Sequence, residues 1–149
     1  MTAVSIPKNP IANWEQARDE WLGRLSGLVE SVEAWAKDLG WSTRRVEKKM
    51  DDSQLGAYSA PGLLMQESTT RVLLEPIARF APGVDGVVDL YLMPAYDDIA
   101  TLYFYDGCWH LHYWFPGMPM AGDLWQTKGK PLSKESVMEV LDEMRKNAA

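Results

Sequence analysis

The chain has 149 residues and a mass of 16.8 kDa, and its 46% hydrophobic and 24% charged residues are typical of one soluble globular domain. The net charge of −6 and the single short basic cluster at residues 44–49, which Glu47 interrupts, argue against nucleic acid as a partner. No segment has the length and apolar composition of a membrane span or a secretory signal, and Cys108 is the only cysteine. These features predict a cytoplasmic protein with no membrane partner.

Two prolines mark residues 1–12 as an extended arm that precedes the folded part of the chain. The remaining residues, 13–149, contain no internal repeat and no low-complexity segment. We therefore expect a single domain over 13–149.

The first predicted element is a long helix that begins after Asn13, which we expect to be the N-cap, with Gln16 at the reciprocal capping position. Gly40 predicts its end. Within it, apolar residues recur at steps of three and four, and only Arg18 interrupts them, so one face of the helix is expected to be buried. The members of this stripe are Trp14, Trp21, Leu25, Leu28, Val32, Trp35 and Leu39.

Beyond residue 41 the hydrophobic period changes from that of a helix to that of a strand. Gly, Pro and Asp separate the alternating segments, which indicates an antiparallel meander. The charged segment 42–50 predicts an edge strand, with a short helix as the alternative, and Ala-Pro-Gly at 60–62 predicts a turn. Further strand patterns lie at 54–58, 62–66, 69–75, 86–93, 99–105 and 108–115.

A short second helix is predicted from Ser133 onward, with Leu132 and Val137 placed for a hydrophobic staple. This order of elements is typical of the α+β class. We expect a long N-terminal helix, an antiparallel meander sheet of about five to six strands and a short C-terminal helix, with both helices packed on one sheet face. The opposite face is then the place for a binding site.

The most specific local signal is Asp106-Gly107, because this dipeptide suits the positive φ angles of a two-residue hairpin turn. With that turn, one face of the hairpin has a core composition: Phe104, Leu102, Ala100, Trp109, Leu111 and Tyr113. The other face is polar, aromatic and titratable: Tyr105, Tyr103, Thr101, Cys108, His110, His112 and Trp114. A slip of one residue would move the histidines to the core side.

Because His110 and His112 share a face of one predicted strand, their imidazoles are candidate ligands for zinc or another divalent transition metal. Cys108, Asp89 or Glu75 would supply a further ligand. The alternative is a set of ordinary polar residues, since the chain shows no metal-binding spacing. Cys108 as a nucleophile activated by His110 is disfavoured, because side chains two apart on a strand start about 7 Å apart.

A second constellation depends on the register of the neighbouring strands. Arg71, Glu75, Asp89 and Tyr91 share the polar sheet face if the strands pair suitably, and carboxylates beside aromatic rings can hold a cationic ligand. The alternative is a set of cross-strand ion pairs and solvated side chains.

Aromatic residues concentrate between residues 103 and 115, and Trp, Tyr and Met are common in protein interfaces. We expect contacts with a partner through Tyr103, Tyr105, Trp114 and Met118, and the acidic segment 54–128 favours a basic protein as that partner. The heptad-like helix leaves a homodimer open.

Enzymatic activity is not favoured, because the chain contains none of the motifs G-x-G-x-x-G, G-x-x-x-x-G-K-[ST], H-E-x-x-H, C-x-x-C or G-x-S-x-G. The sequence therefore predicts a small soluble binding module that engages a protein partner and needs no cofactor. The alternative is a protein that binds a metal or small ligand at His110 and His112, with metal-dependent catalysis as one form of it.

Overall fold

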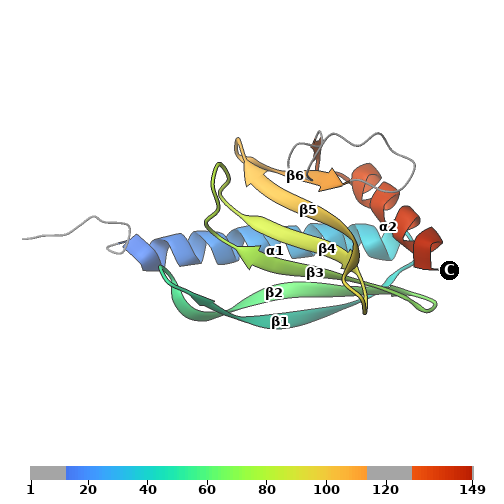
Figure 1. Ribbon diagram of the computed structural model, residues 1–149, viewed down its shortest axis with the longest axis horizontal. Coiled ribbons are helices and arrows are strands. Elements are labelled where there is room, and N and C mark those ends of the chain that lie inside the picture. The colour runs from blue at the N-terminus through green and yellow to red at the C-terminus, as the bar shows by residue number, and fades with distance from the viewer. Residues whose placement is uncertain (1–12, 114–128, 149) are drawn as a thin grey trace, which may run out of the picture.

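The computed structural model describes residues 13–113 and 129–148. The predicted arm at residues 1–12 and two predicted contact residues, Trp114 and Met118, lie outside the described residues. One antiparallel sheet with the strand order β1-β2-β3-β4-β5-β6-β7 runs across a long helix (Figure 1). The elements are α1 (Trp14–Asp38), β1 (Ser42–Asp52), β2 (Gly56–Glu67), β3 (Thr70–Ala78), β4 (Val87–Leu92), β5 (Asp97–Tyr105), β6 (Cys108–Tyr113), β7 (Lys130–Pro131) and α2 (Lys134–Ala148).

The α+β class and the meander are confirmed, with seven strands in place of the predicted five to six. The last strand, β7, is only two residues long, too short to produce an alternating pattern, and it pairs with β6. In the described part of the chain, no helix is both long and apolar enough to cross a membrane.

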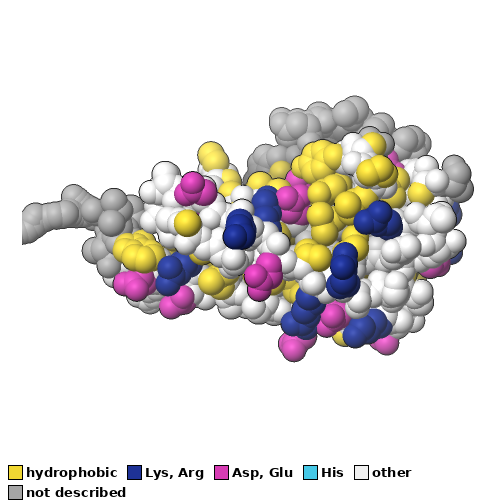
Figure 2. Space-filling view, turned by 90° about the horizontal axis from the view of Figure 1, so that it is seen from below, with side chains coloured by type: hydrophobic (Ala, Val, Ile, Leu, Met, Phe, Trp, Pro, Cys, Tyr) yellow, Lys and Arg dark blue, Asp and Glu magenta, His cyan; other side chains and the backbone are white. Residues whose placement is uncertain are grey.

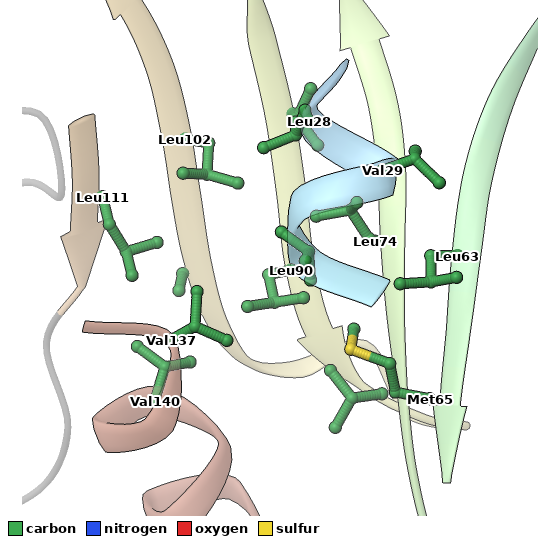
Figure 3. Packing of buried hydrophobic residues seen from close by; sticks show 14 of the residues in the cluster. Leu28, Val29, Leu63, Met65, Leu74, Leu90, Leu102, Leu111, Val137 and Val140 are labelled. Carbon is green, nitrogen blue, oxygen red and sulfur yellow. The ribbon is translucent and has the colours of Figure 1, made fainter. Parts of the chain in front are cut away.

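Both helices cover the same face of the sheet, so the core lies between that face and the helices. In Figure 3, Leu28 and Val29 of α1 and Val137 and Val140 of α2 meet one set of strand residues, which includes Leu74 and Leu90. The buried residues of α1 come from the predicted stripe and its immediate neighbours: Trp21, Leu25, Leu28, Val29, Val32 and Ala36.

The ends of α1 differ in how well the sequence predicted them. Gly40 has a φ of +91° and, as predicted, follows the helix; the Trp41 amide donates to the Ala36 carbonyl at 2.9 Å and the Gly40 amide to the Lys37 carbonyl at 3.1 Å. These two bonds form a Schellman motif. At the other end, α1 begins directly after Asn13 as predicted, but the expectation of a capping hydrogen bond is wrong, because the Asn13 side chain makes none.

The turn predicted at residues 60–62 is also wrong, because β2 runs without a break from Gly56 to Glu67 and pairs with β1 along that whole length. A Cβ atom on Gly62 would lie 2.7 Å from the carbonyl oxygen of Leu74. Gly62 therefore marks a close approach of β2 to β3, for which only glycine is small enough.

The predicted hairpin between β5 and β6 is confirmed residue by residue. Asp106 and Gly107 have φ angles of +52° and +79°, as a two-residue type I′ turn requires. Tyr105 pairs with Cys108, and the register continues without a slip to Ala100 and Tyr113. The histidines therefore lie on the sheet face opposite the helices.

The one-sided core gives a prediction on two adjacent residues of β3. Leu74 is 1% exposed and faces the helices, whereas Leu73 is half-buried on the other face. We expect Leu74→Ala to lower the free energy of unfolding by about 2–5 kcal/mol, because it leaves a cavity in the core. Leu73→Ala should cost less than half as much. Urea denaturation measures both, and equal costs would contradict a core on one face alone.

Candidate functional site

The face of the sheet opposite α1 and α2, here called the outer face, carries one continuous row of polar residues. Glu75 pairs with Asp89, Asp89 with Thr101, and Thr101 with His112, so the four side chains cross β3, β4, β5 and β6 in register. Three of them are buried: Asp89 at 8%, Thr101 at 5% and His112 at 3% exposure. We call these four residues the polar row.

Asp89 is the centre of the polar row. The hydroxyl of Tyr96 donates a short hydrogen bond to one carboxylate oxygen, and Thr101 Oγ1 donates to the other at 3.0 Å. Among the residues that the structure describes, no lysine or arginine lies within ion-pair distance of this carboxylate. Burying an ionised carboxylate costs on the order of several kcal/mol, which two hydroxyl donors offset only in part.

Glu75, the neighbour of Asp89 in the row, has a different environment. It accepts a hydrogen bond from the Tyr91 hydroxyl at 2.9 Å and forms an ion pair with Lys48 Nζ at 2.8 Å. The same ammonium group donates to the Pro76 carbonyl at 3.0 Å. Of the two adjacent carboxylates, Glu75 therefore has a cation partner within the chain and Asp89 has none in the described part.

Two tyrosine rings stand beside the carboxylates. The rings of Tyr91 and Tyr96 meet edge to face with centroids 4.3 Å apart. Tyr96 lies between β4 and β5 with a φ of +57°, and at 45% exposure it is one of the large hydrophobic residues most open to solvent. A non-glycine residue in this left-handed region is unusual, and here it holds the ring over Asp89.

The surroundings keep both phenols protonated. Burial, then the hydrogen bond to Glu75 and the charges of Glu75 and Asp89, raise the pKa of Tyr91 to about 12. The hydrogen bond to Asp89, followed by burial, raises the pKa of Tyr96 even further. Both hydroxyls therefore act at neutral pH as hydrogen-bond donors and not as bases.

The two histidines have different partners. The His112 ring is buried, with Nε2 3.1 Å from the Tyr105 hydroxyl and the Tyr103 ring edge-on at 5.0 Å. A Cβ atom on Gly129 would overlap the His112 ring, so the chain passes directly against it. The imidazole of His110 instead stacks on Tyr105, with ring centroids 3.7 Å apart.

Cys108 Sγ lies 3.7 Å from His110 Nε2, closer than the spacing of residues along a strand indicates, because the two side chains lean toward each other. The thiol is exposed. Within residues 13–113 and 129–148, no three His, Cys, Asp or Glu side chains are grouped so that they could hold one metal ion.

The structure brings most of the predicted site residues onto one face. One end of the polar row is His112 on β6, and its neighbours there are Tyr103, Tyr105 and His110. Asp89 and Tyr91 lie on β4, two strands away. Arg71 shares the outer face but lies four residues from Glu75 along β3, apart from the histidines. The sequence reasoning missed Tyr96 and Lys48, which have no periodic signal that would link them to the carboxylates.

The contact between Tyr96 and Asp89 gives a testable pKa. Asp89→Asn removes the negative charge that disfavours the phenolate, so the pKa of Tyr96 should fall toward about 10. Because the folded pKa is raised, this interaction stabilises the wild-type protein below pH about 10, and the stabilisation is lost as the pH rises through the raised pKa. The ¹³Cζ shifts of tyrosine, followed by NMR as the pH rises, measure the pKa, and urea denaturation at several pH values measures the stability.

Tyr58 is the internal control in that experiment, because mainly burial raises its pKa and Asp89 does not contribute. Its titration should be the same in the wild-type protein and in Asp89→Asn. A Tyr96 pKa that also stays unchanged would contradict the contact.

Comparison with known proteins adds no relative to this geometry: no family model, no curated protein sequence and no solved structure matches the chain.

Proposed function

We propose that this protein is a binding module that recognises a cationic group, a lysine or arginine side chain of a basic protein partner, on the outer face of its sheet. The observation that carries the proposal is the buried carboxylate of Asp89, which has hydroxyl donors but no cation partner in the described part of the chain. A partner's guanidinium or ammonium group would supply the missing charge.

The adjacent carboxylate illustrates this chemistry within the chain. Lys48 already neutralises Glu75 with a direct ion pair, and the same ammonium group donates a hydrogen bond to the Pro76 carbonyl. An incoming cation therefore finds one neutralised carboxylate and one that is not, which directs it to Asp89. The Tyr96 hydroxyl occupies one oxygen of the Asp89 carboxylate, so a cation that binds to that oxygen displaces it.

The tyrosine rings favour the same ligand. Cations are attracted to the faces of aromatic rings, and Tyr91 and Tyr96 border the carboxylates. The net charge of −6 adds a long-range attraction for a basic partner, which raises the rate of encounter more than the final affinity. The raised pKa values of both phenols keep them protonated at neutral pH, so their hydroxyls serve as hydrogen-bond donors at this site.

We expect an arginine-rich peptide, tested as hexa-arginine, to shift the backbone amide signals of β3, β4 and β5 in an NMR titration. Asp89→Asn keeps the shape of the side chain but removes its charge, and should weaken binding at least about tenfold. Asp51→Asn is the matched control, because it removes an equal charge from an exposed position of β1. Equal losses for the two variants would reduce the interaction to non-specific attraction and sink the proposal.

A second candidate function, a site for a divalent transition metal, rests on the pair of Cys108 Sγ and His110 Nε2. An ion bonded to Sγ at about 2.3 Å and to Nε2 at about 2.0 Å would have a bond angle of about 119° between them, within about 10° of the tetrahedral value. Elemental analysis of protein purified without chelators separates the candidates. Near-stoichiometric metal that His110→Ala removes would favour this site, and peptide binding that His110→Ala leaves unchanged would favour Asp89.

A further inference from the structure

The arginines of the chain differ in whether they have partners. There are seven, all within the described residues. Five make ion pairs, hydrogen bonds or ring contacts: Arg18, Arg24, Arg45, Arg79 and Arg145. For Arg44 and Arg71, the described part of the chain offers no such partner. In a protein with six more acidic than basic residues, two guanidinium groups that the described residues leave unpaired point to a ligand.

These two arginines line the same hollow of about 360 Å³ on the outer face. Arg44 is on β1 and Arg71 on β3, with β2 between them and an offset of two residues in register, so their backbones lie about 12 Å apart across the sheet. Arginine side chains are long enough to close this distance over the hollow. The other lining residues are Ser42, Thr43, Leu64 and Gln66.

The hollow is a separate region from the polar row. Along β3, Arg71 precedes Glu75 by four residues, which corresponds to about 13 Å. Leu73 lies between the two regions, two residues after Arg71 on β3, and its partner on β2, Leu64, belongs to the hollow. Seen from the β1 edge, hydrophobic side chains form a patch bordered by lysine and arginine side chains (Figure 2).

The acidic side chains near Arg44 and Arg71 pair with other cations. Glu67, the residue after Gln66 in β2, forms an ion pair with Arg145 at 3.4 Å. Glu75 pairs with Lys48, and Glu33 pairs with Arg45 at 2.8 Å. Within the described part of the chain, no acidic side chain pairs with either arginine of the hollow.

We propose that Arg44 and Arg71 form a binding site for a phosphate monoester. A phosphate monoester carries close to two negative charges at neutral pH, which matches two guanidinium groups, whereas a single carboxylate matches only one. The planar fork of arginine is suited to bidentate bonds with phosphate oxygens. Leu64 offers an apolar wall for the organic group attached to the phosphate.

This inference does not depend on the proposed function at Asp89, and a different set of residues tests it. Phenyl phosphate is the probe, since it combines a dianionic monoester with an apolar group, and calorimetry or NMR titration measures its affinity. Arg44→Gln and Arg71→Gln should each weaken binding at least about tenfold. Arg145→Gln is the control, because that arginine is also exposed to solvent but pairs with Glu67 and Asp142.

Two further measurements test the match of charge. Dimethyl phosphate, which carries one negative charge, should bind at least about tenfold more weakly than phenyl phosphate. Phenyl phosphate should bind more tightly as the pH rises through its second pKa, which is about 6. Equal binding of the two probes, or equal losses in all three arginine variants, would overturn the site. Circular dichroism checks that the variants are folded.

A peptide that contains one phosphotyrosine identifies the source of the phosphate. Binding tighter than that of phenyl phosphate, and lost in Arg44→Gln, assigns the site to a phosphorylated side chain of a protein. Equal binding, likewise lost in that variant, assigns it to a free phosphorylated small molecule. No binding of either probe would overturn the proposal.

Discussion

Residues alternate between the two faces of this sheet, and both helices cover the same face, so every buried polar group on the outer face must find a partner there. The core residues of β3 to β6 meet α1 and α2, and this leaves Glu75, Asp89, Thr101 and His112 to one another and to the tyrosines beside them. Most of these requirements are met by short hydrogen bonds between neighbouring strands. The charge of Asp89 is the requirement that the described residues leave unmet, and the proposed function follows from it.

The outer face therefore carries opposite charges in two places. Asp89 and Glu75 lie near the middle of the sheet with two tyrosine rings, while Arg44 and Arg71 lie over β1 to β3. The apolar residue Leu73 lies between them on β3. A surface with separate charges of both signs can select a partner by the arrangement of its charges, because like charges placed opposite one another weaken binding.

The sequence predicted those parts of the fold that depend on local patterns. The stripe of α1 and the Asp106-Gly107 turn are properties of a few neighbouring residues, and the turn alone fixed which face carries His110 and His112. The predictions that failed depend on other strands. Pro61 and Gly62 are typical of a turn, but pairing with β1 and the close approach to β3 hold them in a continuous strand. Tyr96 reaches Asp89 through the loop after β4, and no sequence period records that contact.

The most direct test of the account is a crystal structure of the protein grown with arginine amide at a saturating concentration. The account predicts a guanidinium group within hydrogen-bond distance of the Asp89 carboxylate, against the ring of Tyr91, with the Tyr96 hydroxyl displaced from that carboxylate. A structure in which Tyr96 still donates to Asp89 and the guanidinium is bound elsewhere, or not at all, would contradict the claim that this buried carboxylate is the cation site.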